Sequence, residues 1–449
     1  MRILMLGWEF PPFFAGGVGV VCSELSKALA RRGEEIIFVM PSGPLQPTSG
    51  TKHLNKFLIA DKDFNEFTEI HESIAKSIKL NITIKTIESL LNPYITFDEY
   101  QKKYSAVKRF MGKEMGFMGQ EGGELYGKNL IEEVYRFAIR AISIGEKEKF
   151  DVIHAHDWTT FPAGIVLKKL TGKPLVVHIH ITEFDKSGGQ HANPEIYKIE
   201  REGMVEADTV IAVSKAVKER CMHNYYIGGE KIVVIHNAST PMISTEYARK
   251  ADVEGRPKIV LFAGRVTLQK GPDYFVEAAK LVLQKNKNVL FVMAGTGDML
   301  NRMIEKVADY GMADKFIFTG FYDRKDAERL FGMADVFVMP SVSEPFGITP
   351  LEAQYKKVPT IISRQTGVSE ILKHCLKVNF WDINALAGKI LEVLAYAPLK
   401  EELKEKGFQE VQLITWDRPA MECIKIYNKY YKPADKTDKK TKTKKSKKS

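Results

Sequence analysis

The sequence of 449 residues has few of the residues that hold small secreted proteins together. Its four cysteines stand far apart, and no two form a CxxC pair: Cys22, Cys221, Cys375 and Cys423. This spacing suggests neither a disulfide framework nor a cysteine zinc site, and a reducing cytoplasm is the expected location. An apolar run long enough to span a bilayer is also missing. The N-terminus, MRILMLGWEFPP, lacks a small-residue cleavage site, so we predict a first strand there and not a signal peptide.

A strong charge of one sign is also missing from the body of the chain. The formal net charge is +10, but residues 434–449 hold eight lysines and two aspartates, which account for six of these charges. This tail has no aromatic residue for base stacking and no apolar helical face, so it is predicted to be disordered. We expect at most a weak contact of the tail with polyanions or an anionic membrane, and no specific nucleic acid partner.

Short β-branched runs alternate with amphipathic stretches along most of the chain, a pattern typical of parallel sheets covered by helices. The first repeat is a strand at residues 3–6, a Gly/Pro turn at 7–17, a helix that Gly33 ends, and a strand at 35–40. The alternation of strand and helix patterns stops at a polar connection, 238–257, and continues from KIVLFAG. We therefore predict an α/β fold with two Rossmann-like, doubly wound parallel-sheet domains, 1–240 and 254–412, and a further amphipathic helix at 415–432.

Residues 52–130 interrupt this rhythm. The segment KRFMGKEMGFMGQEGGELYG mixes glycine, methionine and charge with little periodicity. Such a stretch is interpreted as an insertion or mobile loop, which could cover an active site. A helical cap with a poorly readable pattern fits the same residues equally well.

The second half holds the sharpest group of polar residues. The segment GRVTLQKG places Arg265 and Lys270 directly after a strand and at the start of a helix. Ligands of open α/β sheets bind at the carboxyl ends of the strands, and a helix N-terminus there presents free N–H groups. A guanidinium and an ammonium added to such a turn suit a diphosphate, although two cations on an ordinary loop would look the same in sequence.

Two carboxylates follow in SEPFGITPLEA. Gly347 and Pro345 indicate a loop around Glu344, and a helix beginning near residue 349 would place Glu352 in its first turn. Carboxylates facing one cleft can accept hydrogen bonds from sugar hydroxyls. For Glu352 alone, a favourable charge at a helix N-terminus is an adequate explanation.

A second glycine turn, RQTGVSE, places Thr366 and Gly367 near another helix start. Both residues could donate hydrogen bonds to phosphates. A threonine that caps the helix is an equally good interpretation.

Together these motifs resemble those of the retaining GT-B glycosyltransferases, in the group that includes glycogen and starch synthases. The resemblance covers nearly the whole chain before the tail and rests on GWEFPPFFAGGVG, HAHDW, VHIHITEFD, GRVTLQKG, SEPFGITPLEA and the final helix. It implies two Rossmann-like domains across a central cleft, with the final helix returning to the N-terminal domain. It also implies transfer of a hexose, with glucose favoured, from a nucleoside-diphosphate sugar to a glycan acceptor, as in α-glucan synthesis.

The resemblance assigns roles to residues of the C-terminal half and of the motif HIHITEFD. Arg265 and Lys270 would hold the donor diphosphate, and Glu352 the ribose. Glu344 would contact the transferred hexose near its reacting face, with His180 hydrogen-bonded to the sugar from the opposite side. Gly347, Thr366 and Gly367 complete the expected donor site.

The same resemblance assigns three residues of the N-terminal half. Gly16 and Gly17 would let the first loop approach the sugar and phosphates, which a Cβ would prevent. Asp157 would lie on the acceptor side of the cleft. The other histidines of these motifs are predicted to be core residues with satisfied hydrogen bonds: His154, His156 and His178.

One position departs from the glucan synthases, which typically carry a lysine two residues before the paired glycines. This chain has Phe14 there. A phenyl ring supplies no charge to donor or acceptor, so a hexosyl or mannosyl transferase acting on a small-sugar or lipid-linked acceptor remains an alternative.

The chemistry implied by the resemblance needs no resident cofactor. Arg265, Lys270 and helix N-termini can stabilise the charge that develops on the departing diphosphate, and the sequence shows no DxD-like acidic pair for a metal ion. A nicotinamide oxidoreductase is disfavoured because GTGDML has Leu300 where the dinucleotide fingerprint needs its third glycine. A sugar-nucleotide epimerase of the same fold is disfavoured by the Glu/Glu pair but stays open.

Overall fold

The computed structural model describes residues 1–11, 17–41, 53–54, 56–59, 129–188, 191–241 and 255–431. Most of the predicted insertion at 52–130, all of the predicted tail at 434–449, and both Phe14 and Gly16 lie outside these residues. Over the part of the chain described here, no helix is long and apolar enough to cross a membrane.

The first half of the chain forms a parallel sheet of seven strands. In spatial order these are β3 (Lys56–Ile59), β2 (Glu35–Met40), β1 (Arg2–Leu6), β4 (Val152–His156), β5 (Leu175–Ile179), β6 (Thr209–Ala212) and β7 (Ile232–Val234). The strand order reverses between β1 and β4, which is the position where open α/β sheets bind ligands. Strands β4 and β5 are buried along their whole length because helices cover both faces of the sheet.

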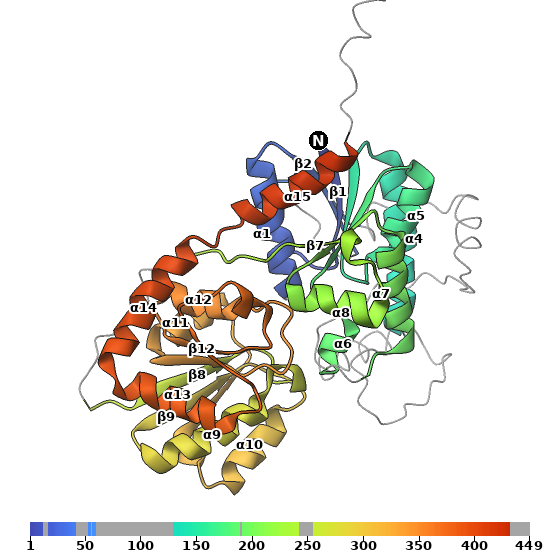
Figure 1. The fold of residues 1–449 in the computed structure, drawn as a ribbon. Helices are drawn as coiled ribbons and strands as arrows, with labels where there is room; N and C mark the ends of the chain where they lie inside the picture. Colours follow the sequence, from blue (N-terminus) through green and yellow to red (C-terminus); the bar gives the residue numbers. More distant parts are fainter. Residues whose placement is uncertain are drawn as a thin grey trace, which may run out of the picture.

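Helices from distant parts of the chain cover this sheet (Figure 1). They are α1 (Gly17–Arg31), α4 (Asn129–Lys147), α5 (Phe161–Thr171), α6 (Glu183–Lys186), α7 (Pro194–Glu206), α8 (Lys215–Tyr225) and α15 (Asp417–Tyr430), with a short 3-10 turn η2 (Gly229–Lys231). The last of them, α15, lies against α1, and its Cys423 and Tyr427 share one hydrophobic cluster with Cys22 and Leu25. The Tyr430 hydroxyl also bonds Thr209 at the start of β6, at 2.7 Å.

The second half forms a parallel sheet of six strands. In spatial order these are β10 (Phe316–Gly320), β9 (Val289–Ala294), β8 (Lys258–Ala263), β11 (Val336–Met339), β12 (Thr360–Ser363) and β13 (Leu376–Val378). Its helices are α9 (Pro272–Lys285), α10 (Leu300–Asp309), α11 (Arg324–Met333), α12 (Thr349–Tyr355), α13 (Ile383–Ala395) and α14 (Ala397–Gln412), with 3-10 turns η3 (Leu268–Lys270), η4 (Ala313–Lys315) and η5 (Gly367–Glu370). The predicted class, two doubly wound parallel sheets, is confirmed.

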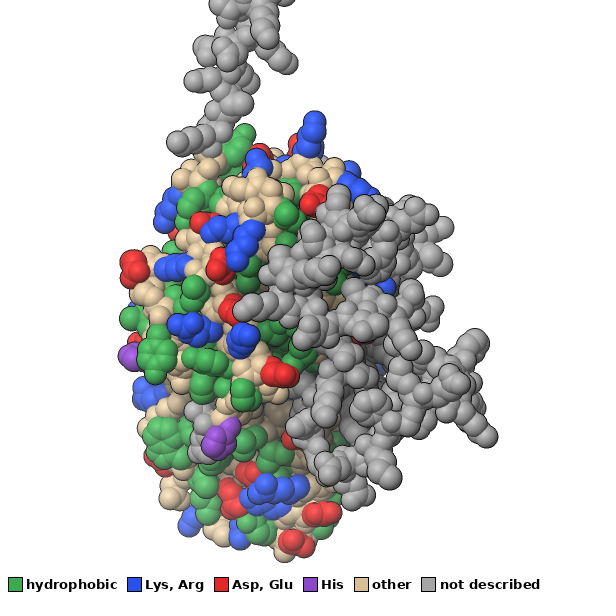
Figure 2. Space-filling model, turned by 90° about the vertical axis from the view of Figure 1, so that its right-hand side faces the viewer, with side chains coloured by type: hydrophobic (Ala, Val, Ile, Leu, Met, Phe, Trp, Pro, Cys, Tyr) green, Lys and Arg blue, Asp and Glu red, His purple; other side chains and the backbone are tan. Residues whose placement is uncertain are grey.

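The two halves sit side by side, and α8 lies between them (Figure 1). Hydrophobic packing continues from one to the other: a single cluster contains Val217 and Cys221 of α8 together with Phe346 and Val368 of the second half. On the described part of the face in Figure 2, basic and acidic side chains are interspersed, which matches the small net charge left once the tail is set aside.

Candidate active site

Tight backbone contacts position the loop that follows β8. Gly264 and Gly295 both have positive φ, and a Cβ on Gly295 would lie 1.8 Å from the carbonyl oxygen of Gly264. Gly271, with φ of 68°, ends η3, and a Cβ there would lie 2.2 Å from the carbonyl oxygen of Pro340. Only glycine permits these approaches, and they press the loop carrying Arg265 and Lys270 against the loop that follows β11.

The result is a direct contact between two of the predicted site residues. The Lys270 ammonium forms an ion pair with the Glu344 carboxylate. Next to it, the Val342 N–H donates to the Gln269 carbonyl at 2.9 Å. The Lys270 and Glu344 side chains are 19% and 10% exposed. The ion pair is therefore largely shielded from solvent, beside the carboxyl ends of the strands.

Glu352 lies in the first turn of α12, and its environment differs from that of Glu344. Burial raises the pKa of Glu352 to about 7, against the opposing effect of the positive charge on Arg324. The same carboxylate is near Tyr322, whose pKa is raised by burial and by Glu352. Within the described residues the Glu352 carboxylate has no ion pair or hydrogen bond, so its oxygens remain available to hydroxyl donors.

Thr366 and Gly367, which were predicted to donate to phosphates, lie beside Glu344. The Thr366 hydroxyl donates to the Ser363 carbonyl at 2.8 Å, and it does not cap the following turn. The Gly367 N–H donates to the Glu344 carbonyl at 2.8 Å. Both donors are used within the protein, and what they do is fix the loop of Glu344. Gly347, with φ of 95°, lets that loop turn.

In the first half, Asp157 follows β4 and holds the chain segment that follows β5. Its backbone is left-handed, with φ of 58°, and its Oδ1 accepts hydrogen bonds from the N–H groups of His180 at 2.7 Å and Ile181 at 3.4 Å. Burial raises the pKa of Asp157 to about 7, while the hydrogen bond from His180 opposes the rise. Asp157 was predicted on the acceptor side of the cleft. Here one of its oxygens orients His180.

Gly17 is the first residue of α1, at the turn that follows β1. A Cβ at this position would meet no protein atom within 4 Å. Among the described residues no contact requires glycine there, and the approach of a ligand stays the predicted reason.

The prediction that three histidines are satisfied core residues is wrong in one respect. His154, His156 and His178 are buried, as expected. Yet several of their ring nitrogens have no hydrogen-bond partner among the described residues. The alternating motifs HAH and HIH put their side chains on one face of two adjacent strands, so that apolar neighbours and other imidazoles surround them.

Sequence reasoning missed a polar link between the two halves beside Glu344. Asp185 of α6 pairs with Arg220 of α8, and the Ser343 hydroxyl donates to Asp185 at 2.8 Å. Arg220 also donates to Ser343 at 3.1 Å. A capping box, in which Thr182 and Asp185 bond each other's backbone N–H groups, orients Asp185. The T-x-x-D spacing was a usable sequence signal for that cap, but nothing in the sequence pointed to Arg220.

A second link joins α8 to η5. The Glu370 carboxylate accepts hydrogen bonds from the N–H groups of Lys215 at 2.9 Å and Ala216 at 3.0 Å, at the positive end of the α8 dipole. His236 reaches the same carboxylate at 2.7 Å. These contacts fix one orientation of the two sheets.

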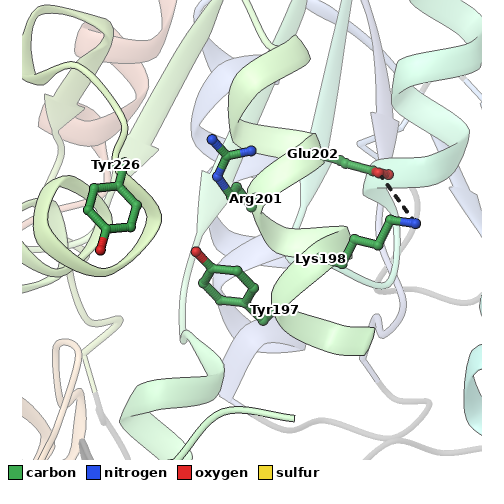
Figure 3. A pocket seen from close by; sticks show the side chains of 5 residues that line it. All are labelled: Tyr197, Lys198, Arg201, Glu202 and Tyr226. Atoms are coloured by element: carbon green, nitrogen blue, oxygen red, sulfur yellow. Dashed lines mark ion pairs between the residues drawn. The ribbon is translucent and has the colours of Figure 1, made fainter. Parts of the chain in front are cut away.

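An open pocket of about 530 Å³ lies elsewhere in the first half (Figure 3). Its lining comes from α7 and the residue after α8: Tyr197, Lys198, Arg201, Glu202 and Tyr226. It contains none of the predicted site residues, so it is separate from the site at the strand ends.

Two Rossmann-like sheets, with a cationic loop and two carboxylates at the strand ends of the second, define a GT-B transferase fold. The family model "Starch synthase catalytic domain" matches residues 2–235, and "Glycosyl transferases group 1" matches residues 244–410. The chain therefore belongs to the group 1 glycosyltransferases with a starch synthase-type N-terminal half, a family of nucleotide-sugar-dependent hexosyltransferases.

Individual relatives agree with this placement. The chain is 28% identical to an uncharacterized glycosyltransferase of Methanocaldococcus jannaschii, over 95% of this chain and 98% of the relative. It is 25% identical to a glycogen synthase of Mycobacterium tuberculosis, over 82% and 80%. Among solved structures, the catalytic domain of starch synthase IV from Arabidopsis thaliana, bound to ADP and acarbose, matches with a TM-score of 0.65 and 15% identity, over 96% of this chain and 99% of that one.

Proposed function

We propose that this glycosyltransferase moves glucose from a nucleoside-diphosphate donor to an α-glucan, with retention of the anomeric configuration. The observation that carries the choice of acceptor is the match of residues 2–235 to the starch synthase catalytic domain. The glycogen synthase relative extends over both halves, which supports the same chemistry for the complete cleft.

Donor binding is assigned to the second half. Lys270 and Arg265 neutralise the diphosphate, and the dipoles of the adjoining helices add to the positive field. Glu352 accepts hydrogen bonds from the ribose hydroxyls. In the free enzyme the Lys270 ammonium is paired with the Glu344 carboxylate. An incoming phosphate competes with Glu344 for this cation. Once the phosphate has replaced it, the Glu344 carboxylate is free to face the hexose.

The transfer step breaks the bond between the anomeric carbon and the diphosphate oxygen. Lys270 and Arg265 stabilise the negative charge on the leaving group, where fixed charges are most effective. The acceptor hydroxyl then bonds to the same face of the anomeric carbon, and its proton passes to the departing diphosphate. Glu344 stabilises the positively charged sugar between the two events. An inverted product anomer in an NMR assay would disprove this step.

His180 contributes from the opposite side of the cleft. Its backbone is held by Asp157, which fixes the position from which the imidazole meets the donor sugar. Closure of the two halves excludes water, which would otherwise hydrolyse the donor.

The test is a screen of UDP-glucose, ADP-glucose and GDP-mannose against glycogen and short maltooligosaccharides, with Glu344→Ala as the inactive control. We expect chain extension from a glucose donor, lost in the control. Phe14 supports a second candidate, a hexosyl or mannosyl transferase with a small-sugar or lipid-linked acceptor. Donor hydrolysis without extension of any glucan would favour that candidate. An epimerised nucleotide sugar as the product would contradict both.

A further inference from the structure

Four histidines form a compact array on one face of the first sheet. His154 and His156 alternate along β4, and His178 and His180 follow along β5 and its end, with His156 directly opposite His178 in the strand register. The ring centroids of His154 and His156 are 4.3 Å apart, and those of His178 and His180 are 4.2 Å apart. The rings are buried, and α1 and α15 cover this face of the sheet.

This array leaves polar atoms unsatisfied. Among the described residues, no hydrogen bond reaches Nε2 of His154, Nε2 of His156, or either ring nitrogen of His178. An unsatisfied buried polar atom costs about 1–3 kcal/mol, and four in one place call for an explanation. One nitrogen from each of these three rings can be chosen so that all three atoms lie within 4.8 Å of one another.

The hydrogen bonds of two of these rings leave their Nε2 atoms available as metal ligands. His154 Nδ1 lies 2.6 Å from the Tyr427 hydroxyl, and His156 Nδ1 lies 2.9 Å from His180 Nε2. If each Nδ1 carries the proton and donates it, both Nε2 atoms present lone pairs. Histidines that bind metal ions in proteins normally donate their second N–H to an acceptor in this way, which fixes the ring and the tautomer.

We propose that His154, His156 and His178 bind one divalent transition-metal ion, with zinc the natural choice for three imidazoles and a fourth position open to water or an anion. Calcium and magnesium prefer oxygen ligands and are not expected here. The ring planes of His154 and His156 are 22° apart and those of His154 and His178 are 14° apart, so the rings are stacked. An ion lies in the plane of each imidazole at about 2.0–2.1 Å from its nitrogen, so binding requires these rings to rotate out of the stack. The ligands come from the first sheet, whereas the residues assigned to the diphosphate come from the second, so this ion has no part in stabilising the leaving group.

The experiment uses the full chain without a polyhistidine tag, stripped with a chelator and titrated with zinc alone. We expect one zinc per chain by calorimetry and elemental analysis, a raised melting temperature, and visible absorption of a four-coordinate ion when cobalt replaces zinc. The variant His178→Gln should lose stoichiometric binding. The control His223→Gln, which changes a histidine on the exposed side of α8, should bind as the wild type does.

A second variant guards against a folding defect in His178→Gln. Tyr427→Phe removes only the hydroxyl next to His154 and should weaken zinc binding by roughly 10- to 100-fold, the usual effect of losing such a partner. If the wild-type protein binds less than about one-tenth of an equivalent of zinc, or if His178→Gln binds as tightly as the wild type, the proposal is wrong. Neither measurement involves a sugar donor, so the result is independent of the proposed transferase activity.

Discussion

The strand ends of the two sheets are built in opposite ways. At the first sheet, buried imidazoles from β4 and β5 leave several nitrogens without partners among the described residues. At the second sheet, the Lys270 ammonium is paired with Glu344. The N–H of Gly367 and the hydroxyl of Thr366 donate hydrogen bonds to neighbouring carbonyl groups. The first edge holds buried ring nitrogens without partners among the described residues, whereas the second must release an internal contact before it can hold a ligand.

This difference separates two kinds of preparation for binding. A self-paired edge is stable when empty, and a ligand gains only the difference between its own contacts and the contacts that it replaces. An edge with unsatisfied groups is destabilised when empty, so an occupant adds stability to the fold itself. Each half can therefore be tested by changing one contact and asking whether activity or stability responds.

The largest expected effect comes from removing the cation of the second sheet. Lys270→Met deletes the ammonium that we assign to the diphosphate, and we expect the rate of transfer to fall by about 100- to 1000-fold, as when a preorganised charge is lost. The measurement is kcat with a glucose donor. The control, Lys287→Met, alters an exposed lysine before β9, at the other end of the strands. Equal activity of the two variants would remove Lys270 from the mechanism.

A smaller effect is expected at the junction between the halves. Arg220→Gln leaves the buried carboxylate of Asp185 without its counter-charge, and the free energy of unfolding should fall by about 3 kcal/mol. Denaturant unfolding measures it, with Arg201→Gln, an exposed arginine of α7, as the matched control. If the two variants are equally stable, the pair of Asp185 and Arg220 orients the two halves without adding to the free energy of unfolding.

The half-buried carboxylate of Glu352 in α12 should make stability depend on pH. The pKa of Glu352 is about 7 in the folded protein against an ordinary 4.5. The folded state thus binds more protons than the unfolded state between these values, so its stability falls as pH rises through this range. Glu352→Gln should match the wild type near pH 4.5 and be more stable by roughly 1–3 kcal/mol at pH 8.

Glu352→Gln should also bind the donor more weakly at pH 8, because an amide accepts fewer hydrogen bonds from the ribose than a carboxylate does. The exposed residue Glu305 supplies the control, Glu305→Gln. A variant that gains stability and keeps full donor affinity would show that the carboxylate is not a ribose ligand.

The smallest expected change is at the turn after β1. Gly17→Ala adds a methyl group that meets no atom of the described residues within 4 Å. The melting temperature should therefore stay the same or rise slightly with the better helix propensity of alanine. The KM for the donor should nevertheless rise several-fold if the sugar and phosphates approach this turn. An unchanged KM would mean that ligands stay away from the start of α1.

The regular elements were readable from sequence because each sheet repeats one simple pattern. The strand predicted at 35–40 is observed at Glu35–Met40, and the loop around Glu344 and the helix carrying Glu352 lie where Gly347 and the spacing placed them. Buried parallel strands read as short apolar runs, and glycines mark their turns.

The hydrogen-bond and ion-pair partners of these side chains could not be predicted from the sequence, because they depend on which strands and helices lie side by side. The sequence does not show that HAH and HIH lie on adjacent strands, or that several of their ring nitrogens have no hydrogen-bond partner among the described residues. The use of the Thr366 hydroxyl by Ser363, and the meeting of Asp185 with Arg220, are likewise decided by tertiary packing. Sequence spacing identifies residues able to do chemistry, but the free or occupied state of each group emerges only in three dimensions.

The return of α15 to α1 means that the chain passes between the two halves twice, once after β7 and once after α14 (Figure 1). Two covalent connections limit how far the halves can separate or turn, beyond the contacts that α8 makes with Ser343 and Glu370. Since β1 and α15 both belong to the same half, anchoring the protein by the start of β1 or by the end of α15 would attach it through that half alone.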